Sequence, residues 1–120
     1  MGEDLDARPI VSEKVSKEMI SMMQSVVEDM GGTGSKGVIP LYHVAGKTGT
    51  ARKLSGGTYG ANYLASFIGI TPASNPNIAI AVTIDNPKGD SYGGGAVAAP
   101  IFANVAKNAL QVMGVKPDKM

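Results

Sequence analysis

The sequence predicts an α+β fold in which an N-terminal helix is followed by a three-stranded antiparallel meander and a C-terminal helix. Two observations support the helices and strands. Apolar residues recur at helical spacing near both ends of the chain, and three apolar segments between them are bounded by connections rich in Gly, Ser, Asn and Pro. Because the connections are too short to cross over a sheet, neighbouring strands are expected to run antiparallel.

The first helix is expected to begin after Ser12, whose hydroxyl can accept a backbone N–H of the first turn. It is expected to end at Gly31-Gly32, because glycine adopts the left-handed conformation of a helix end without a side-chain clash. Between these ends, apolar residues recur every three or four positions. We predict that this stripe packs in the core: Val15, Met19, Met22, Val26 and Met30.

Three strands are expected in the middle of the chain. The first spans Tyr42–Lys53, and a turn region, Ser55–Asn62, leads into the second, Tyr63–Ile70. The third, Ile78–Ile84, is almost continuously apolar, which predicts burial on both faces. Helices are expected to cover one or both faces of the resulting sheet.

The last helix is expected to begin near Pro100, since the fixed φ of proline suits a first helical turn. Gly114 is expected to end it, with Pro117 beyond. We predict that its buried stripe consists of Ile101, Phe102, Val105, Ala109, Val112 and Met113.

Composition excludes several classes of function. A net charge of +1 with scattered basic residues does not predict a nucleic-acid partner, and no apolar run is long enough to span a bilayer. The absence of cysteine excludes disulfides, thiolate metal sites and a cysteine nucleophile. His43, the sole histidine, has no acidic neighbour in the sequence, so we expect a structural role rather than a metal site.

Three glycine-containing patterns could carry chemistry. Residues 32–37 match G-x-G-x-x-G, but a dinucleotide-binding loop follows a strand and opens a helix, whereas here a helix precedes and Pro40 follows. Gly46-Lys47-Thr48 resembles the end of a P-loop, but Leu41 stands where that loop requires another glycine. The third pattern, Lys47-Thr48-Gly49, is the K-T-G element of penicillin-binding proteins and class A β-lactamases, and it lies in a predicted strand.

Longer stretches resemble class B penicillin-binding proteins in order and spacing: Gly31-Gly32-Thr33, Val44–Ala51 and Tyr92–Phe102. The stretch Asp85–Tyr92 is more similar to the division-type, septal transpeptidase than to the elongation-type one. The resemblance covers nearly the whole chain. It implies that residues 1–120 form the C-terminal portion of a penicillin-binding transpeptidase domain, within the penicillin-binding and serine β-lactamase-like fold.

The resemblance implies a role for each residue of the K-T-G strand, which would lie at a sheet edge where an extended peptide can pair with it. Lys47 would place positive charge near the terminal carboxylate of a stem peptide, and the Thr48 and Thr50 hydroxyls would bind that carboxylate. The backbone N–H of Thr50 would complete an oxyanion hole. Gly49 would let the substrate backbone approach.

Arg52 and Ser66 are secondary candidates for the same substrate site, whereas Tyr92 and residues 93–95 are expected to shape a loop over the sheet. The residue types alone also fit a plainer interpretation. In it, Lys47 and Arg52 are exposed cations that protect a sheet edge, and the threonines are ordinary strand residues.

Acyl transfer needs motifs that this sequence does not contain. In the family, a serine nucleophile and a lysine base lie in S-x-x-K, opposite an S-x-N loop; here no serine is followed by lysine three residues later or by asparagine two residues later. Because acylation needs a nucleophile beside its base, we expect this chain to be inactive by itself. The resemblance implies no metal or other cofactor.

The resemblance implies that the full-length parent cross-links peptidoglycan stem peptides ending in D-Ala-D-Ala at the division septum. It would act through a serine acyl-enzyme that β-lactam antibiotics inhibit. Divisome partners, a periplasmic location and an inner-membrane anchor formed by an N-terminal helix absent from this chain are also implied. The strand Ile78–Ile84 would keep an open edge through which the chain is expected to self-associate. Two alternatives stay open: a serine β-lactamase, and a non-catalytic binding or scaffold domain of the same fold.

Overall fold

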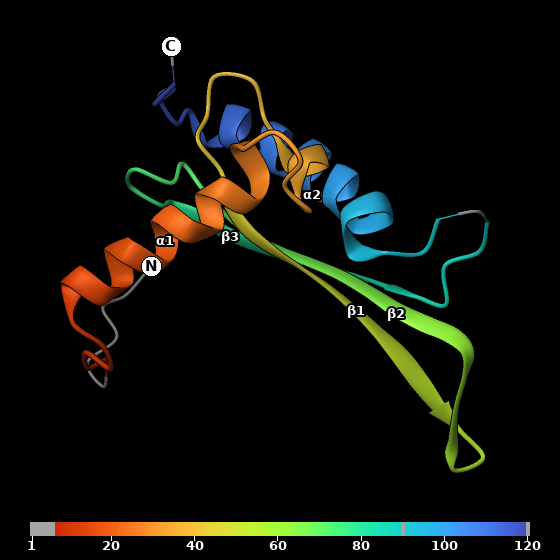
Figure 1. The fold of residues 1–120 in the computed structure, drawn as a ribbon. Helices are drawn as coiled ribbons and strands as arrows, with labels where there is room; N and C mark the ends of the chain where they lie inside the picture. The colour runs from red at the N-terminus through yellow and green to blue at the C-terminus, as the bar shows by residue number, and fades with distance from the viewer. Residues whose placement is uncertain (1–6, 90, 120) are drawn as a thin grey trace.

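The computed structural model describes residues 7–89 and 91–119, and Figure 1 shows their arrangement. The strands form one antiparallel sheet in the order β1-β2-β3, as the short connections predicted. The α+β class and the order helix, meander, helix are confirmed. The elements are α1 (Glu13–Glu28), the 3-10 helix η1 (Ser35–Gly37), β1 (Ala45–Ser55), β2 (Thr58–Thr71), β3 (Ile78–Asp85), the π-helix η2 (Gly94–Ala98) and α2 (Ala99–Met113).

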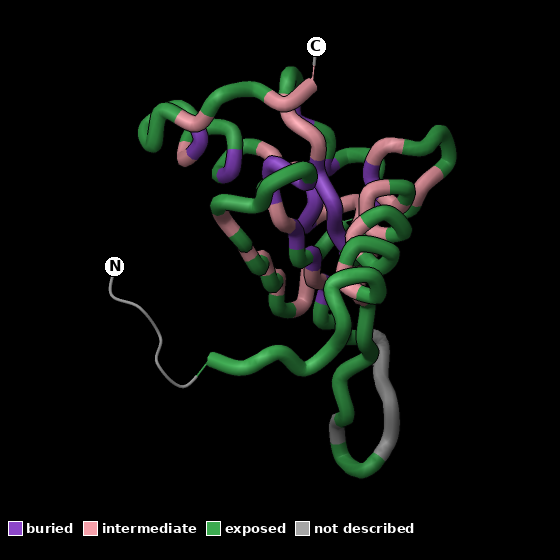
Figure 2. The backbone as a smooth tube through the Cα atoms, turned by 90° about the vertical axis from the view of Figure 1, so that its left-hand side faces the viewer, coloured by how far each residue is buried: buried purple, intermediate pink, exposed green. Residues whose placement is uncertain are grey.

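Both long helices contribute to one hydrophobic core on a single face of the sheet. The core joins Val27 of α1, Phe67 of β2 and Phe102 of α2, with the two phenylalanine ring centroids 4.9 Å apart. Ile68, the next residue along β2, points to the opposite face and is 52% exposed. Figure 2 shows the buried stretches gathered in the middle of the molecule, whereas the opposite face of the sheet is open.

The first two strands differ from the prediction at their ends. A two-residue turn, Gly56-Gly57, joins them, and both glycines have positive φ (+60° and +83°), as the tight hairpin turns require. The predicted turn region Ser55–Asn62 is therefore wrong, because strand pairing continues almost to the turn. The first strand begins at Ala45 instead of Tyr42, since Tyr42 closes a turn by a bridge to Ile39.

The third strand has the predicted position but not the predicted burial. Its residues alternate between half-buried and exposed along the whole strand. The larger side chains, such as Ile80 and Val82, pack against the core, whereas the small Ala79 and Ala81 face outward. Burial on both faces is wrong for this chain, because the helices cover one face only.

The predicted apolar stripes of both helices are largely wrong. On α1, Met19 and Met22 are exposed and Val27 is the buried residue; Met30 lies beyond the end of the helix and is exposed as well. On α2 the fully buried residues are Ala99, Phe102, Ala106 and Leu110. Of these, the predicted stripe contained Phe102 alone. The small alanines let this helix approach the sheet closely, and the larger apolar residues lie on its flanks.

Three of the four predicted helix ends are confirmed: the Ser12 hydroxyl accepts the backbone N–H of Val15 at 3.2 Å, α2 begins at Ala99 beside Pro100, and Gly114 ends α2 with φ of +66°. The predicted end of the first helix at Gly31-Gly32 is wrong, because α1 ends at Glu28 and its C-cap, Asp29, is extended; Gly31, with φ of +82°, belongs to the turn that follows. Within residues 7–89 and 91–119, no helix is both long enough and apolar enough to cross a membrane.

Candidate functional site

The K-T-G residues lie on β1, which forms one edge of the three-stranded sheet among the described residues. Thr48 pairs with Phe67 and Thr50 pairs with Ala65, both of which are buried. Since cross-strand partners share a face, the two threonines lie on the helix-covered face of the sheet. Lys47 pairs with the exposed Ile68 and therefore lies on the open face. The strand thus presents hydroxyls on one face and an ammonium group on the other.

The hydroxyl of Thr50 is hydrogen-bonded to the turn that begins η2. The backbone N–H of Gly94 donates to Thr50 Oγ1 at 3.0 Å. Gly94 is buried, and a Cβ at this position would lie 2.1 Å from the carbonyl oxygen of Ser66 and 2.6 Å from that of Gly49. The turn therefore packs directly on the backbones of β1 and β2, and only glycine fits there.

The hydroxyl of Thr48 meets a different segment. Thr48 Oγ1 lies 3.3 Å from Thr33 Oγ1, in the turn that follows α1. Gly95, at the start of η2, closes the other side, because a Cβ there would lie 2.1 Å from the Thr33 carbonyl oxygen and 3.5 Å from Thr48 Cγ2. Two segments remote in sequence therefore meet over the same face of the K-T-G strand.

Lys47 is exposed, and its ammonium group donates to the carbonyl oxygen of Thr48 at 2.8 Å. Gly49 pairs with Ser66, and a Cβ on Gly49 would lie 2.7 Å from Ser66 Oγ. The Ser66 hydroxyl donates to the Gly49 carbonyl oxygen at 3.5 Å, the outer limit of a hydrogen bond. The absence of a side chain at Gly49 therefore leaves room for Ser66.

Arg52 lies two residues beyond Thr50 and contacts a stacked pair of tyrosines. Its guanidinium carbon is 5.9 Å from the ring centroid of Tyr63, at the limit of a cation–π contact. Tyr63 in turn stacks on Tyr92, with centroids 4.0 Å apart. Arg52 is exposed. This arrangement ties the loop before η2 to the sheet and places a cation along the same strand as the threonines.

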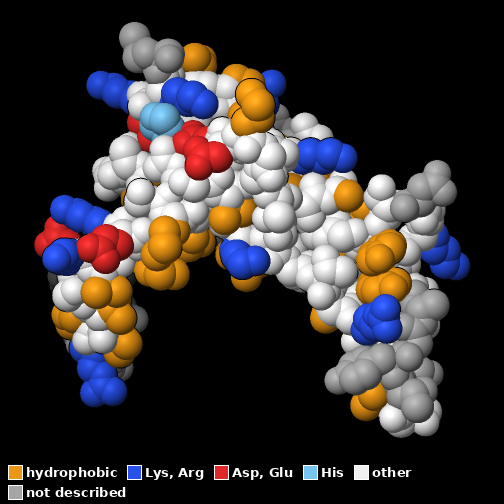
Figure 3. All heavy atoms as spheres, in the orientation of Figure 1, with side chains coloured by type: hydrophobic (Ala, Val, Ile, Leu, Met, Phe, Trp, Pro, Cys, Tyr) orange, Lys and Arg blue, Asp and Glu red, His pale blue; other side chains and the backbone are white. Residues whose placement is uncertain are grey.

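His43 is not isolated, contrary to the sequence-based expectation. Its Nδ1 lies 2.7 Å from Glu28 Oε1, and its backbone N–H donates to Asp118 Oδ1 at 2.7 Å. Figure 3 shows the pale blue histidine beside red acidic side chains. Ser74 donates to the other Asp118 oxygen at 2.6 Å, so the C-terminal segment is joined to the start of β1 and to the β2–β3 turn. The structural role predicted for His43 agrees with these contacts.

The pKa of Asp118 is lowered. Burial acts in the opposite direction and raises it, but hydrogen bonds from the Ser74 hydroxyl and from the backbone N–H groups of His43 and Ser74 outweigh it. The carboxylate is therefore stabilised in its charged form. Among the residues that the structure describes, no group of three or more His, Cys, Asp or Glu side chains could hold a metal ion.

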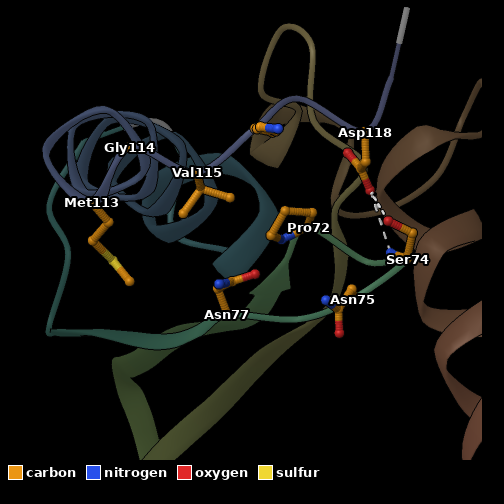
Figure 4. A pocket seen from close by; sticks show the side chains of 9 residues that line it. Pro72, Ser74, Asn75, Asn77, Met113, Gly114, Val115 and Asp118 are labelled. Carbon is orange, nitrogen blue, oxygen red and sulfur yellow. Dashed lines mark hydrogen bonds between the residues drawn. The ribbon is translucent and has the colours of Figure 1, made fainter.

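A cavity of about 360 Å³ lies near the C-terminal segment, and Figure 4 shows it with the Asp118–Ser74 hydrogen bonds dashed. A second cavity, of about 430 Å³, lies between α1 and the β2–β3 turn. Neither is lined by a residue of the K-T-G strand. The first is lined by Pro72, Ser74, Asn75, Asn77, Met113, Gly114, Val115, Lys116 and Asp118. The hydroxyl, ammonium and guanidinium groups of β1 thus lie outside both cavities.

The predicted residues lie together on β1, but the groups that hold them were not predicted. Thr33 and the glycine turn were noted only as matching sequence blocks, and the loop over the sheet expected from Tyr92 and residues 93–95 is present. Chemically, the strand offers two hydroxyls, an ammonium group and a guanidinium group, which suit a carboxylate.

Comparison with known proteins identifies the family. Residues 3–107 match the penicillin binding protein transpeptidase domain. The chain is 43% identical over 113 residues to stage V sporulation protein D of Bacillus subtilis, covering 93% of this chain and 17% of that protein. It is 45% identical over 112 residues to peptidoglycan D,D-transpeptidase FtsI of Buchnera aphidicola (subspecies Schizaphis graminum), covering 92% and 20%.

A solved structure shows the same fold. The apo TP domain of penicillin-binding protein 3 from Burkholderia pseudomallei superposes with a TM-score of 0.84 at 35% identity, covering 98% of this chain and 37% of that one. The chain spans about a fifth of the length of the two curated relatives, at 17% and 20%. The K-T-G strand, its flanking turns and these similarities agree, and the chain belongs to the penicillin-binding protein transpeptidase family.

Proposed function

We propose that this chain is the C-terminal portion of the transpeptidase domain of a peptidoglycan D,D-transpeptidase, and that β1 is its substrate-binding strand. The observation that carries the proposal is the placement of Thr48 and Thr50 on one face of an edge strand, with the hydroxyl of Thr48 bonded to that of Thr33 and the hydroxyl of Thr50 accepting the backbone N–H of Gly94. The name of the FtsI relative, peptidoglycan D,D-transpeptidase, supports the same reaction.

The substrate would be a stem peptide ending in D-Ala-D-Ala, bound as an extended strand along β1. An edge strand offers unpaired N–H and C=O groups for such pairing. The hydroxyls of Thr48 and Thr50 would donate to the terminal carboxylate, with Arg52 supplying positive charge on the same face of the strand and Lys47 from the opposite face. The backbone N–H of Thr50 would be one donor of an oxyanion hole, and loss of one such donor typically costs about 10²–10³ in rate.

The nucleophile would come from S-x-x-K in a part of the parent protein outside this chain. Its serine oxygen would attack the carbonyl carbon of the D-Ala-D-Ala bond while the lysine takes the hydroxyl proton. The terminal D-Ala would leave as the amine after receiving a proton. An amine of a second stem peptide would then attack the ester, form the cross-link and release the serine. β-Lactam antibiotics would acylate the same serine.

Labelling with a fluorescent penicillin tests the proposal, applied in parallel to this chain and to its full-length parent. We expect stable labelling of the parent and none of the chain alone, because the chain contains neither S-x-x-K nor S-x-N. A parent that labels and then sheds the label quickly is a serine β-lactamase. A parent that never labels is a non-catalytic binding or scaffold domain, and either result overturns the transpeptidase proposal.

We further propose that the parent acts in the periplasm during cell division, held in the inner membrane by an N-terminal helix and accompanied by divisome proteins. The similarity to FtsI supports this role, although the similarity to a sporulation protein supports a related role in spore formation. Depletion of the parent in growing cells distinguishes them. Filaments without septa would support the division role, whereas normal growth with defective sporulation would contradict it.

We propose that the chain alone self-associates through the free edge of β3. Among residues 7–89 and 91–119, β3 pairs on one side only, and exposed backbone groups at an edge can template pairing with another copy. Sedimentation velocity across a hundredfold range of concentration tests this proposal. A rising sedimentation coefficient is expected, and a constant monomeric value would contradict it.

A further inference from the structure

Thr33 lies at a meeting point of three segments. It follows α1, faces Thr48 of β1 across 3.3 Å between the two hydroxyl oxygens, and its carbonyl oxygen contacts Gly95 at the start of η2.

The backbone around Thr33 is held firmly. A Cβ on Gly32 would lie 2.3 Å from the Val26 carbonyl oxygen, and the Gly34 N–H donates to that same oxygen at 3.0 Å. Gly34 is buried against the ring of Phe67, where a Cβ would lie 3.0 Å from a ring carbon. Thr33 therefore sits between two anchored neighbours, so its hydroxyl is presented to Thr48 from a fixed position.

The hydroxyl protons of Thr48 and Thr50 differ in whether they are free to bind a ligand. A threonine hydroxyl has one proton and can accept two hydrogen bonds. At Thr50 the partner is the backbone N–H of Gly94, which can only donate, so the Thr50 proton stays available for another acceptor. At Thr48 the partner is a second hydroxyl: in this structure Thr48 donates to Thr33 Oγ1, and either hydroxyl can take the other role by rotating its proton. If Thr33 donates, the Thr48 proton is available in the same way.

We propose that Thr33 is a positioning residue for Thr48, and this rests on the proposed function of β1 as a carboxylate-binding strand. With a carboxylate bound, Thr33 donates to Thr48 Oγ1, and Thr48 donates its own proton to the ligand. A carboxylate can only accept hydrogen bonds, so a Thr48 proton that points at Thr33 cannot also be donated to the ligand. The 3.3 Å separation is long for a hydroxyl pair, and it is expected to shorten when the ligand binds.

The test uses the full-length parent and measures second-order acylation rate constants for benzylpenicillin and for its methyl ester, by competition with a fluorescent penicillin. Thr33→Val removes the hydroxyl and keeps the shape, whereas Thr33→Ser keeps the hydroxyl. The value of one hydrogen bond predicts that Thr33→Val slows acylation by benzylpenicillin about three- to tenfold. The ester, which has no carboxylate, is expected to react at an unchanged rate, and Thr33→Ser is expected to restore the rate with benzylpenicillin.

Ser25→Ala serves as the matched control, because it removes an exposed hydroxyl from α1 that, among the described residues, donates within the helix to the Ser21 carbonyl oxygen. It is expected to change neither rate. Equal slowing of both probes by Thr33→Val shows a structural role and overturns the proposal, as does no slowing of either. If the unaltered parent never labels, the proposed function itself fails, which is a different result from a labelled parent that is insensitive to Thr33.

Discussion

Replacement of Gly94 by alanine tests how closely the turn before α2 must pack on the K-T-G strand. The added Cβ would lie 2.1 Å from the Ser66 carbonyl oxygen and 2.6 Å from that of Gly49. Ordinary contact begins near 3.4 Å, so the turn must move by at least about 1.3 Å, since backbone atoms on both sides cannot swing away. That movement breaks the 3.0 Å hydrogen bond from the Gly94 N–H to Thr50.

The expected cost combines two effects. Overpacking costs about 1–3 kcal/mol and the lost hydrogen bond about 0.5–1.5 kcal/mol, so we expect Gly94→Ala to lower the free energy of unfolding by about 2–4 kcal/mol. Acylation by benzylpenicillin should slow as well, because the Thr50 hydroxyl loses the donor that orients it.

Gly93→Ala is the matched control. A Cβ on Gly93 meets only Thr50 Oγ1, at 3.6 Å, and its φ of −76° suits any residue. This variant is expected to stay within about 0.5 kcal/mol of the unaltered protein, as for a surface substitution. Denaturant unfolding and acylation rates of the full-length parent measure both effects. If Gly94→Ala unfolds and acylates like Gly93→Ala, the inferred packing of the turn on the strand is incorrect.

Three further changes have defined outcomes in the full-length parent. Phe102→Ala removes a fully buried ring that contacts Phe67, and should lower the free energy of unfolding by about 3–5 kcal/mol in denaturant titrations. Because the pKa of Asp118 is lowered in the fold, its carboxylate contributes stability above about pH 4, and this is lost as the pH falls through the lowered pKa. Thermal melts should therefore show Asp118→Asn destabilising at pH 7 and progressively less so as the pH falls below about 4. Thr50→Val leaves the N–H of Gly94 without its acceptor and should slow acylation by benzylpenicillin more than about tenfold, whereas Thr50→Ser should retain most of the rate.

The order of elements could be predicted because local signals fix it. The Ser12 cap and the left-handed Gly114 each act within one helical turn, and both are present as predicted. The face that each helix buries could not be predicted in this way. On α2 the apolar residues nearly surround the helix, and the buried face is the one whose small members, Ala99 and Ala106, allow close approach. The distance between a helix and the sheet depends on tertiary packing, and the spacing of apolar residues in the sequence does not predict it.

In the candidate site, too, the local features could be predicted from the sequence and the long-range contacts could not. The K-T-G motif is contiguous, so its residues and their two faces follow from sequence and strand alternation. The partners of its hydroxyls are 15 and 44 residues away, at Thr33 and Gly94, and no spacing rule links them to the strand. The acidic partners of His43 are likewise 15 and 75 residues distant, which is why a lone histidine was expected.

The aromatic pair in the core explains how such distant segments meet the threonines in register. The rings of Phe67 and Phe102 are surrounded by glycines, and each glycine marks a backbone that approaches a ring closely. A Cβ on Gly46 would lie 2.5 Å from the Phe67 ring, and one on Gly69 would lie 2.4 Å from that of Phe102. Because protein interiors are close-packed, the volume of these two rings sets the separation of β1, the turn after α1 and the start of α2. A change in either ring should therefore alter the hydroxyl contacts on β1, although neither ring touches a ligand.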